Sequence, residues 1–142
     1  MVALSLNDPV VPVSAYPPDP ASMAMVNFLR FVFMKCRSKR RTGLFEACAL
    51  LQTTRTASQE ALGEALARGL SEGLGRPTRL HAPGAAELTF DEKWLVQLAG
   101  AITTGDTASE TFLLASRVPM PHRRLIRFLV AGVSEHFLTN LE

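Results

Sequence analysis

Residues 23–41 read MAMVNFLRFVFMKCRSKRR, an almost wholly apolar run that switches abruptly to positive charge. No acidic residue stands between Asp19 and Glu46. Asp19 followed by Pro20 is typical of a helix start, with Asp as the N-cap and Pro at the first helical position. The pattern predicts a helix from about Pro20 to Arg37 whose surface is apolar around most of its circumference. Such a helix is usually central in its domain or buried in an oligomer interface.

The rest of the chain predicts further helices and no strands. Residues 1–18 are rich in proline, so we expect an irregular N-terminal arm followed by a single helical domain over residues 19–142. Apolar residues at helical spacing predict helices within residues 43–53, 56–72, 89–105, 107–118 and 121–141. The pair within residues 90–118 has a short connection, so it is expected to form an antiparallel hairpin. No segment alternates with a period of two, and the fold class is therefore predicted as all-α with about five to six helices.

Local signals mark where these helices begin and end. Three capping boxes, in which Thr is followed three residues later by Gln or Glu, predict helix starts. They are Thr56 with Gln59, Thr89 with Glu92, and Thr107 with Glu110. Gly73 with Gly75, and later Gly105, are expected to end helices, and Pro83 with Gly84 predicts a turn. The last helix is expected to bury Leu125, Ile126, Leu129, Val130, Val133, Phe137 and Leu141.

Composition limits the class of protein. The chain has 142 residues, a formal net charge of +2 and two cysteines. A chain of this length can form a stable hydrophobic core without disulfides or metal ions. The net charge is too small to indicate nucleic-acid binding by itself. Cys36 and Cys48 form neither a disulfide framework nor a zinc pair, so we expect reduced thiols in the cytoplasm, with no metal and no cofactor. The apolar run ending at Met34 is shorter than the roughly 20 residues that a membrane span requires.

Two groups of cations are candidate anion-binding sites. The first group lies where the helix at 20–37 ends and comprises Lys35, Arg37, Lys39, Arg40 and Arg41. The helix dipole favours cations at the C-terminal end of a helix, and cations also keep that end in water. These two effects explain most of this group without an anionic ligand. The second group lies beside His122 and comprises Arg117, Arg123, Arg124 and Arg127. Cations near a helix N-terminus are disfavoured by the dipole, which suggests an anion, although pairing with Glu110 or Glu135 is an alternative.

The aromatic residues of the first helix are candidate interface residues. Phe28, Phe31 and Phe33 point in different directions around that helix, and a domain of this size can hardly cover all of them. An uncovered apolar face usually binds a partner. Trp94, with Phe45, Phe112, Phe128 and Phe137, lies at helical spacing and is expected in the core, as are these phenylalanines.

Catalytic patterns are weak. The histidines are scattered without a metal-ligand or nucleophile arrangement, and His81, with Glu87 and Asp91 nearby, is the most enzyme-like of them. The glycines between Gly69 and Gly75 follow a helix, whereas phosphate-binding loops follow a strand. A helix-turn-helix over residues 44–70 is disfavoured because its recognition helix would be mainly acidic.

The sequence thus favours a small helical protein-interaction or adaptor module without catalytic activity. We expect it to self-associate as a homodimer through the helix at 20–37 or through the N-terminal arm. A nucleic-acid or polyanion-binding protein that uses the two basic groups is the alternative. A sensor with a small-molecule pocket between its helices is a third possibility.

Overall fold

The structure is a computed structural model that describes residues 19–38 and 55–138. These ranges contain five helices and no strand, which confirms the all-α prediction. The helices are α2 (Pro20–Ser38), α4 (Arg55–Leu74), α5 (Phe90–Thr104), α6 (Thr107–Arg117) and α7 (Met120–Leu138). The helix predicted at 43–53 and the N-terminal arm lie outside the described residues.

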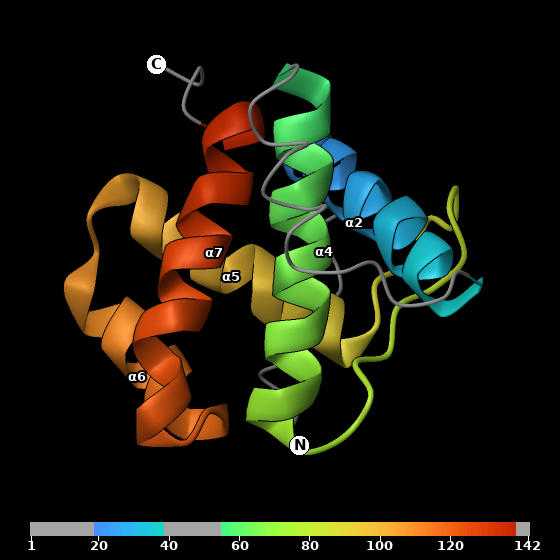
Figure 1. Cartoon of the computed structure of the whole chain (residues 1–142). Helices are drawn as coiled ribbons and strands as arrows, with labels where there is room; N and C mark the ends of the chain where they lie inside the picture. Colours follow the sequence, from blue (N-terminus) through green and yellow to red (C-terminus); the bar gives the residue numbers. More distant parts are fainter. Residues whose placement is uncertain (1–18, 39–54, 139–142) are drawn as a thin grey trace, which may run out of the picture.

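The helices surround one core. α4 and α7 pack side by side, α2 packs against both of them, and α5 runs behind the pair (Figure 1). α6 packs on α5, as the hairpin prediction requires, and also contacts α7. Leu70, Leu98 and Ile126 are completely buried where α4, α5 and α7 meet. From α2, Met25 and Leu29 join the same core, so the apolar opening segment is a central helix.

Glycines allow α4 and α7 to approach closely. Gly73 was expected to end its helix, but it lies inside α4, and a Cβ there would stand 2.8 Å from Cδ1 of Ile126. On α7, a Cβ at Gly132 would stand 3.3 Å from a methyl group of Leu62. The helix ends instead before Gly75, whose φ of +72° suits a residue without a side chain.

The start of α5 agrees with its prediction, whereas the start of α6 differs by one residue. Thr89 and Glu92 form the complete capping box of α5. At α6 the N-cap is Asp106 instead of Thr107, and its carboxylate accepts hydrogen bonds from the backbone N–H of Ser109 at 3.2 Å and the Ser109 hydroxyl at 2.7 Å. Asp is a stronger N-cap than Thr, which explains the correction.

Because Asp106 is the N-cap, substitutions at Asp106 and at Thr107 should lower the free energy of unfolding by different amounts. Asp106→Ala removes the acceptor for the first turn of α6 and should lower the free energy of unfolding by about 1 kcal/mol. Thr107→Ala, at the first helical position, should leave it within about 0.5 kcal/mol of wild type. Urea denaturation followed by circular dichroism compares the two variants, and a larger loss in Thr107→Ala would contradict the assignment.

The other local predictions are confirmed at one turn and corrected elsewhere. The box of Thr56 with Gln59 does not mark the start of its helix, because α4 already begins at Arg55. Phe112 and Phe128 were expected in the core but are 71% and 65% exposed, because they lie on the outward sides of α6 and α7. Pro83 and Gly84 form the expected turn, closed by a 3.2 Å hydrogen bond from the Ala85 N–H to the Ala82 carbonyl. Leu125 was expected in the core but is 50% exposed. It lies at the edge of the apolar arc, and the neighbouring helices do not reach it. The predicted residues Ile126, Leu129, Val130 and Val133 are buried, and Phe137 is partly buried. Leu141 lies outside the described residues.

Candidate functional site

A buried ion pair joins α2 to α5. Arg30 is 1% exposed, and its Nε and Nη2 donate to the two carboxylate oxygens of Glu92 at 2.8 and 3.0 Å. The remaining guanidinium N–H groups donate to Asn27 Oδ1 at 3.0 Å and to the carbonyls of Ala85 at 2.8 Å and Glu87 at 3.0 Å. Since every nitrogen has an acceptor, the charge of Arg30 is fully used inside the protein and is not presented to a ligand.

Glu92 both caps α5 and holds the connector that precedes this helix. It completes the capping box by accepting the Thr89 N–H at 2.8 Å, and it also accepts the His81 N–H at 2.9 Å. Burial alone would raise the pKa of Glu92, but the hydrogen bonds from Arg30, Thr89 and His81 outweigh it and lower the pKa. The carboxylate therefore fixes the connector between α4 and α5 (residues 75–89) against both α2 and α5.

Asp91 is the centre of a second network. Its carboxylate accepts hydrogen bonds from Arg76 at 2.9 and 3.2 Å, from the backbone N–H of Arg79 at 2.7 Å and from Arg117 at 2.7 Å. Burial would raise the pKa of Asp91, but these donors together lower it to about 2. Because cations and an N–H already occupy Asp91, it is not available to orient a catalytic histidine.

Arg117 is held between aromatic rings. Its guanidinium carbon lies 4.9 Å from the ring centre of Phe90 and 5.1 Å from that of Trp94. Trp94 is buried as expected, and its Nε1 donates to the Leu113 carbonyl at 3.0 Å. Stacking and the ion pair with Asp91 make this arginine a link between α5 and α6, and its buried Nη1 has no hydrogen-bond partner among the described residues.

Most arginines of the second basic group form ion pairs or hydrogen bonds within the protein. Arg127 pairs with Glu110, which was the alternative considered for these arginines. Arg123 donates from Nε to the Val118 carbonyl at 2.7 Å, where α6 ends. Arg124 is exposed. Of the four candidate arginines in this group, two are therefore paired with acids and one binds a backbone carbonyl.

The first basic group is described only in part. Lys35 lies 3.3 Å from the carboxylate of Glu60 on α4. The side chain of Arg37 lies outside the described residues, as do Lys39, Arg40 and Arg41. The end of α2 and the start of α7 lie at different sides of the molecule in Figure 1, so Lys35 and the second group are not brought together.

The three interface candidates occupy three environments. Phe33 is 8% exposed and belongs to the core. Phe28 is partly buried and contacts Phe137 with ring centres 5.5 Å apart. Phe31 is 52% exposed, and Met34, one turn further along α2, is 41% exposed. Among the described side chains of α2, those of Phe31 and Met34 thus form an exposed apolar side that another molecule could contact.

Within the described ranges, no group of three or more His, Cys, Asp or Glu side chains could hold a metal ion. In the same ranges no helix combines the length and the apolar character that a membrane span requires. His81 is exposed, and only its backbone N–H takes part in the network around Glu92.

Sequence reasoning missed the two carboxylates that organise the site. Glu92 was predicted as a capping residue, but no partner was predicted for Arg30, the arginine within the apolar run of residues 23–34. A lone arginine in such a run is itself the signal, because burying it requires a carboxylate elsewhere. Comparison of the chain with family models, with curated proteins and with solved structures finds no match.

Proposed function

We propose that this protein is a helical interaction module that self-associates through the outer face of α2. That face is defined by Ala24, Phe31 and Met34, which lie on one stripe of the helix and are all exposed. The observation that supports the proposal is the exposure of Phe31 and Met34 on a helix that buries Met25, Leu29 and Phe33 in the core. Exposed adjacent apolar side chains are typical of protein interfaces.

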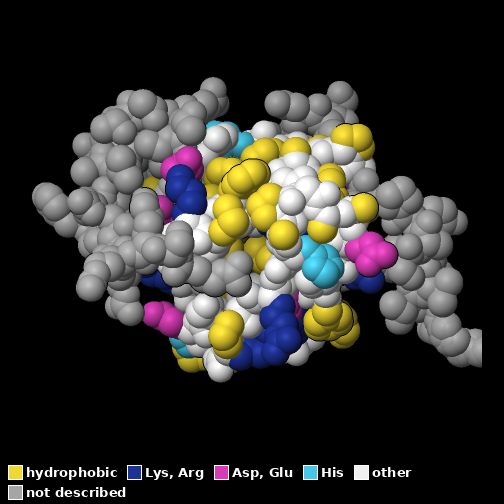
Figure 2. Space-filling model, turned by 90° about the vertical axis from the view of Figure 1, so that its right-hand side faces the viewer, with side chains coloured by type: hydrophobic (Ala, Val, Ile, Leu, Met, Phe, Trp, Pro, Cys, Tyr) yellow, Lys and Arg dark blue, Asp and Glu magenta, His cyan; other side chains and the backbone are white. Residues whose placement is uncertain are grey.

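The molecular surface supports the same choice. Figure 2 shows the side of the molecule on which α2 and the connector lie, and hydrophobic side chains gather in the middle of this face with Lys and Arg towards its edges. An apolar centre with a polar rim is the usual anatomy of an interface. Other exposed hydrophobic residues lie on α5, α6 and α7, and they provide matched controls: Phe90, Phe112, Met120, Leu125 and Phe128.

Polyanion binding is a second candidate function. The ion pairs that candidate cations already form within the protein argue against it. Lys35 is paired with Glu60, Arg117 with Asp91 and Arg127 with Glu110. A cation that is already paired gains less from binding a phosphate. We also propose a cytoplasmic location, because the two cysteines do not make a disulfide framework. We propose no catalytic role.

Sedimentation velocity tests self-association directly. The wild type should form a dimer at low salt and also at about 1 M NaCl, since apolar contacts are little screened by salt. Phe31→Glu places a charge in the interface and should weaken the dimer at least about thirtyfold, as expected for the loss of about 2 kcal/mol at an aromatic hot spot. Phe128→Glu changes an aromatic residue on α7 that is 65% exposed, against 52% for Phe31, and should leave the dimer intact.

Two results would contradict the proposal. A wild type that stays monomeric at high concentration rules out self-association, and equal weakening by Phe31→Glu and Phe128→Glu removes the assignment to α2. Binding to heparin that falls steeply with salt, without any dimer, would favour the polyanion alternative.

A further inference from the structure

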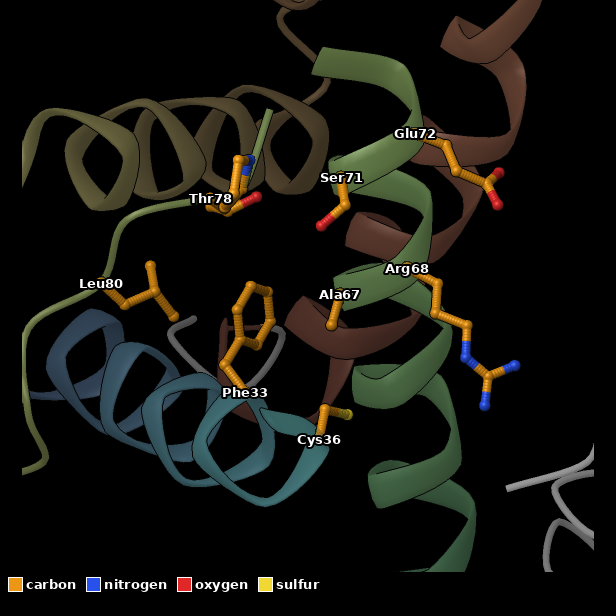
Figure 3. A pocket seen from close by; sticks show the side chains of 9 residues that line it. Phe33, Cys36, Ala67, Arg68, Ser71, Glu72, Thr78 and Leu80 are labelled. Carbon is orange, nitrogen blue, oxygen red and sulfur yellow. The ribbon is translucent and has the colours of Figure 1, made fainter. Parts of the chain in front are cut away.

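A cavity of about 400 Å³ lies between α2, α4 and the beginning of the connector. Its walls are mainly apolar and include Phe33 from α2, Ala67 from α4 and Leu80 from the connector. In Figure 3 the side chains of Phe33 and Leu80 point into this space. The volume falls in the range typical of small-molecule sites.

Two residues with hydroxyl groups, Thr78 and Ser71, line the same space. The hydroxyl oxygen of Thr78 is buried and has no hydrogen-bond partner among the described residues. Ser71 stands opposite on α4, and in Figure 3 its hydroxyl is directed towards the cavity. A buried hydroxyl without a partner is unfavourable. Rotation of the Thr78 side chain would bring its hydroxyl to the cavity, where a ligand that supplies a donor or an acceptor would satisfy it.

The charges beside the cavity favour a neutral ligand. The charged residues that line it are Arg68 and Glu72, one of each sign, and both side chains extend away from the interior in Figure 3. A charged group inside would be removed from water without an opposite charge directed at it, which is costly.

We propose that this cavity binds a small neutral amphiphile, with its apolar body against Phe33, Ala67 and Leu80 and one hydroxyl or carbonyl group hydrogen-bonded to Thr78 and Ser71. The site is separate from the outer face of α2, because Phe33 and Phe31 lie on different sides of the helix. Ligand binding and self-association are therefore tested independently.

A set of probes with one chain length separates apolar binding from charge preference. Octanol, octanoate and octylammonium are titrated into the full-length isotope-labelled protein, and binding is followed by the shifts of amide resonances. Octanol should bind saturably and shift Thr78 and Leu80, and each ionised probe should bind at least about tenfold more weakly. Tighter binding of an ionised probe, or shifts confined to another part of the chain, would overturn the proposal.

Two substitutions locate the site. Thr78→Val keeps the shape of the side chain and should weaken octanol binding about fivefold to tenfold. Ser71→Leu fills the mouth of the cavity and should abolish binding, whereas Ser116→Leu, at an exposed serine on α6, should leave it unchanged. Wild-type affinity in Ser71→Leu would overturn the site, and wild-type affinity in Thr78→Val would overturn the role of its hydroxyl.

Discussion

Replacement of Arg30 by methionine should lower the free energy of unfolding by about 3–5 kcal/mol, the usual cost of breaking a buried ion pair by removing one partner. The substitution leaves the Glu92 carboxylate buried without its cation. It also removes the donors to the carbonyls of Ala85 and Glu87. Guanidinium denaturation followed by far-ultraviolet circular dichroism measures the loss.

Two further variants separate the ion pair from a general effect of the substitution. Arg124→Met removes an exposed cation and should change stability by less than about 0.5 kcal/mol. The double variant Arg30→Met with Glu92→Gln removes both charges but keeps a side-chain acceptor for the N–H groups of Thr89 and His81, and it should be more stable than Arg30→Met alone. A double variant less stable than Arg30→Met would show that the unpaired carboxylate is not the cause of the loss.

Replacement of Asp91 by asparagine should cost about 2 kcal/mol at neutral pH and should weaken the response of the protein to acid. The pKa of Asp91 is lowered from 3.8 to about 2 by its hydrogen bonds to Arg76, Arg79 and Arg117, which outweigh burial. A lowered pKa stabilises the folded state above the unfolded value, and this stabilisation is lost as the pH falls from about 5 towards 2. The asparagine variant lacks this titration.

Denaturation at several pH values between about 7 and 2 measures this difference. The gap between the wild type and Asp91→Asn should be largest at neutral pH and should narrow in acid. Glu87→Gln, at an exposed glutamate of the same connector, serves as the control and should follow the wild type. A constant gap at all pH values would show that the loss does not come from the charge of Asp91.

Helix boundaries were predictable because their causes are local. The capping box of Thr89 with Glu92 lies within one turn, and Gly105 ends α5 through its own left-handed conformation. The same locality explains the small errors. At α6 two adjacent residues both suit the N-cap position, and the stronger acceptor, Asp106, takes it.

The ion pairs were not predictable because their partners are distant in sequence. Arg30 and Glu92 are 62 positions apart, and Arg117 and Asp91 are 26 positions apart. Helical periodicity identifies which residues share a face, but it does not identify the helix that packs on that face. Arg117 was therefore a candidate anion-binding residue, although it is an internal link in the structure.

The excess of apolar surface on α2 was predictable, but its direction was not. Phe31 and Phe33 are two positions apart, so they point to nearly opposite sides of the helix. Contacts with α4, α5 and α7 determine that Phe33 is buried and Phe31 exposed. The composition of the helix specifies how much apolar surface it has, and the tertiary contacts specify which part remains uncovered.

The most direct test of the two roles of α2 is the dependence of the melting temperature on protein concentration. If the outer face of α2 forms the dimer, the melting temperature of the wild type should rise with concentration, because dissociation is coupled to unfolding. Glu92→Gln weakens the inner contact and should lower the melting temperature while keeping this dependence. Phe31→Glu should abolish the dependence. A melting temperature of the wild type that does not change with concentration would contradict the account.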